Sequence, residues 1–465
     1  MAIFSQLALA QVAPSSLPVG TIIPSVVCSA DNKQSYALYL PSNFSNTRPW
    51  PIMYVFDPAA RGQVAVETIK TAAERFGYIV VASNNSRNGP MGGSSQAMKA
   101  MWQDTHERLP IAEQRRYVAG MSGGARVATS IALSCQGCVA GVIANAAGFP
   151  FGAEPTRDMK FTYYAAVGNA DFNYGEFVDL RRKLDAAGAR YRIRIFDGQH
   201  GWAPPEIWME ALNWMDMQAM SAGTMPRDPS RIQQTFASAF AKAREFQSQN
   251  DLLAAFREYQ SLVRDFRGLA DLTSAKTALA EWAKNRAVKT AEKEEASALD
   301  QQARMTSSLS SQIQAIATSD RYQVDIGDLK RNIADLKKRA DASRSPNDLK
   351  TLVLHRALGQ LVIEAHESGQ RSLEEKNYRA AVVYFDLAAA GSANPAWAHY
   401  QRARAYAMLA DKKNTLAELK LSLADGFHEA SALEAAEFQA FQGQPEFQAL
   451  AAEWKLAAEK ERAKP

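Results

Sequence analysis

Residues 117–127 read YVAGMSGGARV, and this stretch decides the fold. Tyr117–Ala119 is a short apolar run typical of a strand, and a helix pattern begins at Ala125, so the glycine-rich segment between them predicts a strand-to-helix turn. A serine in such a turn takes a strained backbone conformation that lifts its hydroxyl clear of the sheet, and small neighbours at Gly120 and Gly124 let the strand and helix approach closely. The G-x-S-x-G pattern in this context makes Ser122 the candidate nucleophile. The alternative is a glycine-rich turn with an incidental serine.

Working outward from this turn, short apolar runs alternate with amphipathic segments. The expected strands are Tyr36–Leu40, Ile52–Phe56, Tyr78–Ala82, Tyr117–Ala119, Val139–Ala144, Phe161–Val167 and Arg192–Phe196. The expected helices are Val64–Phe76, Ser95–Leu109, Ala125–Leu133, Gly175–Ala187 and Pro205–Met217. This alternation predicts a mainly parallel sheet with helices on both faces. Ligands bind such sheets at the carboxyl ends of the strands.

The composition changes near residue 220. Residues 1–220 hold 18 of the 26 glycines and 13 of the 19 prolines, so the remaining 245 residues have few turn formers and predict almost continuous helix. We therefore expect a catalytic domain at 30–220, a linker at 221–229, a helical region at 230–345 with long spacer helices and a weaker match to the repeat unit described below, and helical repeats with a cap at 346–465. Residues 1–29 are expected to be a lead-in. On this division, deletion of residues 221–465 should leave activity on a small soluble ester largely unchanged.

Elimination among the six histidines identifies the candidate base. Four lie in the helical half, and His106 lies in a polar helix segment typical of a solvated surface. His200 remains, in a loop after the last expected strand and after the serine in chain order, where this arrangement places its base. Asp171, in the loop after Phe161–Val167, is the favoured acid, because it would hold the imidazole in the required tautomer. Asp197 is the competitor and is more typical of an Asp-Gly turn.

Other residues complete the expected site. The oxyanion hole should combine the amide of Gly123 with one amide from the loop after Ile52–Phe56, with Ala59 as first choice and Ala60 as second, because Pro58 has no N–H. Only a dozen residues separate the strand at 139–144 from the next, too few for a helical lid, so an open site is expected. Its candidate lining residues, each of which could equally be core, are Met121, Phe149, Phe151 and Trp202.

The composition excludes some classes of function. A formal net charge of +4 is too weak to indicate nucleic-acid binding, and no apolar run reaches the 18 residues of a membrane span. The apolar start with Ala8-Leu9-Ala10 resembles the end of a secretory signal without its basic region, which favours a periplasmic or secreted protein over a cytoplasmic one. Cys135 and Cys138 form a C-x-x-C for which a core thiol and a surface thiol are the simpler interpretation, although a disulfide involving Cys28 stays open.

The helical half contains a repeat. Similar residue types recur at an offset of 34, pairing Gly369 with Ala403, Ala381 with Thr415, Phe385 with Leu419 and Ala388 with Ser422. Small residues let two helices of a hairpin close, and a large residue fills the groove between them, which is the pattern of tetratricopeptide repeats. A plain helical bundle is the alternative. Such repeats favour a protein partner.

These motifs carry a family resemblance. Residues 30–220 resemble an α/β hydrolase, and are most similar to compact esterases of the dienelactone-hydrolase, feruloyl-esterase and polyhydroxybutyrate-depolymerase type, through the GMSGG turn, the GNAD loop and the GQHGW loop in family order. The resemblance implies hydrolysis of carboxylic esters with no metal and no organic cofactor. Serine at position 122 disfavours a dienelactone substrate, since dienelactone hydrolases use cysteine.

The first hypothesis is a serine carboxylesterase in which Ser122, His200 and Asp171 cleave a small or polymer-derived ester through an acyl-enzyme. A catalytically idle hydrolase fold on a scaffold of repeats is the second hypothesis. A third keeps the same three residues but gives them an amide or peptide substrate.

Overall fold

The computed structural model describes residues 17–462 except 318–323, 344, 346 and 430. The possible signal at residues 8–10 lies outside the described residues. Eight strands form one sheet in the order β1-β2-β4-β3-β5-β6-β7-β8. Their bounds are β1 Ile22–Val27, β2 Ser35–Tyr39, β3 Trp50–Phe56, β4 Ile79–Ser83, β5 Ile111–Met121, β6 Gly141–Asn145, β7 Thr162–Gly168 and β8 Tyr191–Phe196.

The sheet is mainly parallel, which confirms the predicted fold class. Strands β3 to β8 all pair in parallel, while β2 pairs antiparallel with both β1 and β4. All seven predicted strands are present. Strand β1 was not predicted, because it lies within the expected lead-in. It is a half-exposed edge strand that contains Pro24, so it has neither the apolar run nor the clean alternation that marks a strand in sequence.

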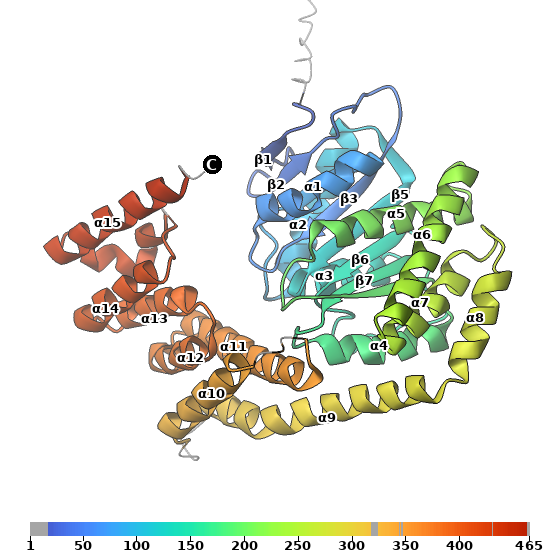
Figure 1. Ribbon diagram of the computed structural model, residues 1–465. Helices are drawn as coiled ribbons and strands as arrows, with labels where there is room; N and C mark the ends of the chain where they lie inside the picture. The colour runs from blue at the N-terminus through green and yellow to red at the C-terminus, as the bar shows by residue number, and fades with distance from the viewer. Residues whose placement is uncertain (1–16, 318–323, 344, 346, 430, 463–465) are drawn as a thin grey trace, which may run out of the picture. The chain divides into compact units, whose positions relative to one another are not determined.

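Five helices flank the sheet (Figure 1): α1 Gly62–Phe76, α2 Met91–Arg108, α3 Gly123–Ser134, α4 Tyr174–Ala187 and α5 Pro205–Ala222. Helices α1 and α5 pack together over one face, where alternate residues of β2 to β7 form a large buried cluster with them. Helices α2 and α3 pack together, and Arg126 of α3 forms an ion pair with Glu176 of α4. Successive side chains of a strand point to opposite faces of the sheet. In the central strands both sets are buried, so apolar groups cover both faces of the sheet, as in other parallel sheets.

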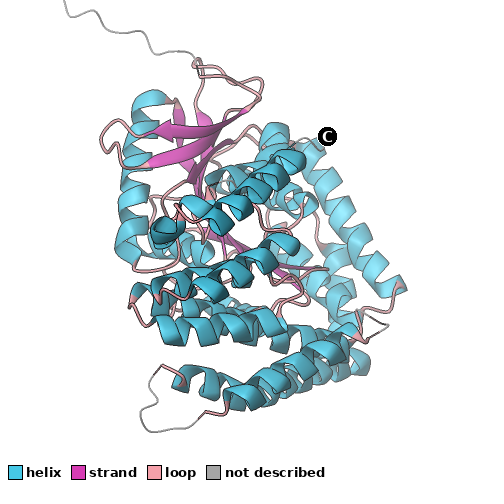
Figure 2. Cartoon of the chain, turned by 90° about the vertical axis from the view of Figure 1, so that its left-hand side faces the viewer, coloured by secondary structure: helices cyan, strands magenta, loops and turns pink. Residues whose placement is uncertain are grey.

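The rest of the described chain is helical and forms the yellow to red part of Figure 1, and helices drawn in cyan make up most of Figure 2. Its helices are α6 Pro229–Ser248, α7 Leu252–Asp265, α8 Thr273–Ala283, α9 Arg286–Ala315, α10 Ile326–Asp341, α11 Leu349–Glu374, α12 Tyr378–Gly391, α13 Ala396–Met408, α14 Lys412–Ala424, η1 Ala432–Glu434, η2 Ala436–Phe441 and α15 Pro445–Arg462. Many begin at an Asp or Asn whose side chain accepts a hydrogen bond from a first-turn amide, as at Asp228, Asp251, Asp325, Asp348, Asn377 and Asp411.

The chain divides into two compact units. The first comprises the chain up to Gly168 together with Glu176–Phe196 and Gly201–Val288. The second comprises Asn169–Gly175, Asp197–His200 and everything from Lys289 onward. The compact first unit therefore extends past the composition change at residue 220 and includes α6, α7 and α8.

Buried ion pairs explain why α7, against which α6 and α8 pack, belongs to the first unit. Arg192 of β8 reaches Glu258 and Asp265 of α7 at 2.6 and 2.8 Å, and Arg194 of β8 reaches the other oxygen of Glu258 at 3.0 Å. All four side chains are buried. Although burial alone would raise the pKa of Glu258, the two guanidinium groups hold it below its ordinary value. Without α7, two buried cations would lose these carboxylates.

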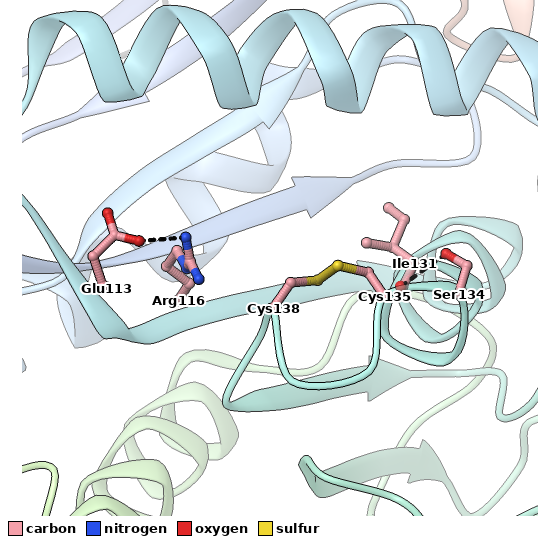
Figure 3. Close-up of a disulfide and its surroundings, with 6 residues drawn as sticks. All are labelled: Glu113, Arg116, Ile131, Ser134, Cys135 and Cys138. Carbon is pink, nitrogen blue, oxygen red and sulfur yellow. Dashed lines mark hydrogen bonds and ion pairs between the residues drawn. A yellow bond between two sulfur atoms is a disulfide. The ribbon is translucent and has the colours of Figure 1, made fainter.

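Cys135 and Cys138 form a disulfide that closes the turn after α3 (Figure 3), while Cys28 is free and buried. The interpretation of C-x-x-C as two independent thiols is therefore wrong. The two residues flank a turn in which Gly137 has a φ of 90°, and the Cys138 amide donates to the Cys135 carbonyl at 3.0 Å. This turn brings the two side chains together, which the helix and strand patterns on either side did not indicate.

The predicted repeat positions lie inside the helical packing. A Cβ on Gly369 of α11 would lie 2.8 Å from the ring of Phe385 of α12, so a larger residue there would displace the ring. At the offset positions Ala403 and Leu419 are fully buried in the cluster formed by α13, α14 and the segments after them. The assignment to tetratricopeptide repeats stays a prediction. None of the helices within the described residues combines the length and the apolar character that crossing a lipid bilayer requires.

We predict that Glu258→Gln destabilises the protein by about 3 kcal/mol, because breaking a buried ion pair leaves uncompensated charge in the interior. Urea unfolding followed by circular dichroism measures this change. Since the folded-state pKa of Glu258 is lowered, its contribution is present above the ordinary glutamate pKa and is lost as the pH falls through the folded value. The variant should therefore lose less stability than the wild type on acidification.

Glu281→Gln is the matched control, because Glu281 is exposed on α8 and the same substitution there should change the free energy of unfolding by less than about 0.5 kcal/mol. Equal stability of both variants would show that the ion pairs do not hold α7 against β8.

Candidate active site

The turn between β5 and α3 has the strained geometry that the sequence predicts. Ser122 has φ 54° and ψ −123°, a left-handed φ that a residue with a side chain rarely adopts. A Cβ on Gly120 would lie 2.3 Å from the backbone of Gly124, and a Cβ on Gly124 would lie 2.0 Å from the carbonyl oxygen of Phe56. Both glycines are therefore required for β5, α3 and β3 to approach, and the predicted reason for their presence is confirmed.

Asn145 supports this turn from the neighbouring strand. Its carbonyl accepts the amide N–H of Ser122 at 2.8 Å, and its buried side chain accepts from the Ala203 amide at 2.7 Å and donates to the Ala166 carbonyl at 3.3 Å. One residue thus joins β6 to the serine turn, to β7 and to the segment that follows the histidine loop. Its role was not predicted, although an amide residue at the end of a fully apolar strand is an unusual signal in the sequence.

The predicted acid and base are hydrogen-bonded. Both carboxylate oxygens of Asp171 lie 3.0 Å from Nδ1 of His200. An ionised carboxylate only accepts, so Nδ1 carries the proton in this pair and Nε2 of the neutral ring is left as the acceptor. Asp171 is fully buried and also accepts from the Asn173 amide at 2.8 Å. Asp197, the competing acid, accepts instead from the side chain of Asn169 at 3.3 Å.

The three predicted residues follow parallel strands. Ser122 comes directly after β5, Asp171 three residues after β7, and His200 four residues after β8. The carboxyl ends of these strands lie at one edge of the sheet. The serine turn belongs to the first unit and the Asp171–His200 pair to the second.

The loop after β3 is organised by a residue that the sequence analysis did not select. The buried carboxylate of Asp57 accepts from the Ala59 amide at 2.8 Å, from Nε and Nη2 of Arg61 at 2.9 Å each, and from the indole of Trp202 at 3.0 Å. An acidic residue directly after a buried strand was the available signal. The Asp57 carbonyl also accepts from Ala60, whose φ is 61°.

These bonds bear on the expected oxyanion hole. Gly123 is the first residue of α3, so its amide has no acceptor within the helix. The amides of Ala59 and Ala60 both donate to Asp57, so neither is available as the second donor in this conformation. Their role stays a prediction that now requires the loop to release one amide.

The candidate lining residues differ in exposure. Met121 and Phe149 are buried, and Phe149 packs on Tyr163, so core packing accounts for both. Phe151 is 95% exposed, with the Arg126 guanidinium 5.0 Å from its ring centre. Trp202 is partly buried and packs on Trp208. Two cavities of about 420 and 590 Å³ in the first unit are lined by other residues, so they do not define the substrate site.

The sheet order and the serine turn fix the architecture. The fold class is that of the α/β hydrolases. No protein-family model and no curated protein matches the sequence. Solved structures that match about two-fifths of the chain include a ferulic acid esterase (17% identity, 41% of this chain and 94% of that one, TM-score 0.34), the S-formylglutathione hydrolase FrmB from Staphylococcus aureus (12%, 43% and 98%, 0.34) and an esterase from the archaeon Pyrobaculum calidifontis (11%, 43% and 87%, 0.36). At these TM-scores the matches carry no argument about function.

We predict that Gly124→Ala disrupts the serine turn, because the added methyl group would overlap the Phe56 carbonyl. The variant should lose at least about 1–3 kcal/mol of stability and most of its reactivity toward a fluorophosphonate probe. Thermal unfolding and probe labelling measure the two effects.

Gly92→Ala is the control, since nothing lies within 4 Å of a Cβ at that position in the first turn of α2. If Gly124→Ala labels as fast as Gly92→Ala and unfolds at the same temperature, the close approach is not required.

Proposed function

We propose that the protein is a serine hydrolase that cleaves carboxylic esters, with Ser122 as nucleophile, His200 as general base and Asp171 as the acid that orients it. The observation that carries the proposal is the strained φ of Ser122 at a strand-to-helix turn, in a chain whose Asp171 binds Nδ1 of His200. Strain of this kind is stored where function requires it. A buried carboxylate on Nδ1 is what makes Nε2 of a histidine a competent base.

The reaction follows from these groups. Nε2 of His200 takes the proton of the Ser122 hydroxyl as its oxygen forms a bond to the ester carbonyl carbon. The imidazolium, stabilised by Asp171, then gives that proton to the departing alkoxide as the ester C–O bond breaks, which releases the alcohol and leaves an acyl-enzyme. Water, deprotonated by His200, attacks the acyl carbon. The acid departs, and the proton returns to Ser122.

The amide of Gly123 is proposed as one donor to the tetrahedral oxyanion, because a helix N-terminus offers both an N–H with no acceptor inside the helix and the positive end of the helix dipole. Phe151 and Trp202 are proposed to border an open substrate cleft. The exposure of Phe151 and the short connection between β6 and β7 support an ester that is small or is the end of a polymer.

Ser122→Ala should lower turnover of p-nitrophenyl acetate and butyrate by roughly three or more orders of magnitude and abolish fluorophosphonate labelling, since no other group forms the acyl bond. His200→Ala should do the same, and Asp171→Asn should lower turnover while the protein stays folded.

Ser134→Ala at the exposed end of the same helix is the control and should keep wild-type activity. Full activity of Ser122→Ala or His200→Ala would rule out the proposed triad. A folded wild type that neither labels nor turns over would favour the scaffold hypothesis. Cleavage of peptide or amide substrates in preference to esters would favour the third.

The proposed periplasmic or secreted location is supported by the Cys135–Cys138 disulfide, because such bonds persist in oxidising compartments. Alkylation of the denatured protein without reductant should modify Cys28 alone, and all three cysteines after reduction. Three modified cysteines in protein isolated from its native host without reductant would contradict this location.

A further inference from the structure

The loops that carry Asp171 and His200 pack with the helical half of the chain in the second unit. Helices α9 and α11 contribute side chains that bind the backbone and a side chain of the loop that carries Asp171, and these helix side chains are buried. These contacts suggest a role for the helical half beyond partner binding.

The segment Asn169–Gly175 carries Asp171 and is called the acid loop below. Arg356 of α11 contacts both ends of this loop. Its Nε donates to the Asn169 carbonyl at 2.6 Å, two residues before Asp171, and its guanidinium carbon lies 3.6 Å from the ring centre of Tyr174, three residues after it. The side chain is only 2% exposed. Burial lowers the pKa of Arg356, and the negative charges of Glu295 and Asp171 act in the opposite direction.

Helix α9 binds the same loop from its own side. Glu295 accepts the hydroxyl of Tyr174 at 2.5 Å, and Gln302 donates its side-chain amide to the Phe172 carbonyl at 3.3 Å. Both α9 side chains are buried. Hydrogen bonds between buried polar groups fix orientation, because no water replaces a lost partner.

The acid loop is hydrogen-bonded in turn to the histidine loop, Asp197–His200. The side chain of Asn169 accepts from the Gly198 amide at 3.2 Å, and the Ala170 amide donates to the Gly198 carbonyl at 2.9 Å. The ring of Phe172 packs on the imidazole of His200 with 4.3 Å between ring centres. A Cβ on Gly359 of α11 would lie 3.6 Å from the Phe172 ring, so α11 passes directly behind it.

We propose that α9 and α11 set the positions of Asp171 and His200, with Arg356 as the principal positioning residue. This inference rests on the proposed function, since it concerns the geometry of the same acid and base. It makes the helical half a part of the catalytic machinery rather than an appendage to a complete enzyme. Arg356 contacts no reacting group and acts through Asn169 and Tyr174.

The test compares Arg356→Met and Arg356→Lys in the full chain, with p-nitrophenyl acetate as substrate. Small displacements of catalytic groups cost up to about a hundredfold in rate. Arg356→Met should therefore lower kcat by roughly 10- to 100-fold per active site titrated with fluorophosphonate, with KM changed less than about threefold. Arg356→Lys, which keeps the charge but loses the planar fork, should recover part of the loss.

Arg404→Met is the matched control, because Arg404 is a partly buried arginine of α13 that binds Gln401 and Glu437 instead of the catalytic loops. It should keep wild-type kcat per active site. If Arg356→Met does not fold, Tyr174→Phe, which removes only the hydroxyl bound by Glu295, should lower kcat several-fold at unchanged KM. Wild-type kcat in a folded Arg356→Met or Tyr174→Phe, or an equal loss in Arg404→Met, would overturn the proposal.

A spectroscopic readout separates this proposal from the proposed function. The Nδ1 proton of His200 in its bond to Asp171 should give a downfield proton resonance that disappears in His200→Gln. Arg356→Met should shift that resonance or broaden it through solvent exchange, whether or not the wild type turns over ester. An inactive wild type with a resonance that responds to Arg356 would refute only the function. An active wild type with an unchanged resonance and unchanged kcat in Arg356→Met would refute only the positioning role.

Discussion

The contact between three backbone segments at the serine turn constrains the rest of the first unit. Gly124 lies against the Phe56 carbonyl of β3, and Gly120 of β5 lies against Gly124, at distances that leave no room for a Cβ. Because α3 starts there, this contact fixes the direction of the helix and its packing against β5 and β6. The positive φ of Ser122 is the consequence, since no ordinary backbone conformation reverses the chain so sharply. The buried hydrogen bonds of Asn145 stabilise the strained residue from the adjacent strand.

Buried charge, rather than apolar area alone, determines which segments belong together. Arg192 and Arg194 on β8 find their carboxylates on α7, and Arg356 on α11 binds the backbone of the acid loop. Each of these arginines would be costly to bury without its partner, so the segments that supply the partners are held in fixed register. This is why the boundary between compact units does not coincide with the change in composition. The composition of a segment indicates its secondary structure, but it does not indicate which distant residues form ion pairs with its charged side chains.

Much of the fold and of the candidate site could be predicted because the signals are local. The alternation of apolar runs and amphipathic segments gave seven strands and five helices, and the spacing of Gly120, Ser122 and Gly124 indicated the turn. The pairing of Asp171 with His200 could be predicted because both residues follow strands of one parallel sheet. Strand β1 could not be predicted, since an edge strand with a proline shows no regular alternation of apolar and polar residues. The roles of Asp57 and Asn145 also depend on partners more than 50 residues away, to which no local pattern refers.

The burial of Asp171 gives a physical reason for the helices of the second unit to pack around the segment that carries it. A carboxylate with no exposed surface must be held by its surroundings, and in the second unit those surroundings include Tyr174 and Phe172, which α9 and α11 bind. A loop of five residues between β7 and α4 cannot by itself enclose its own carboxylate and also hold the imidazole of His200 at a fixed angle. Helices α9 and α11 provide further buried contacts to this loop. On this argument a displacement of α11 reaches Asp171 and His200 through the contacts of Arg356 and Gly359 with the segment that carries Asp171.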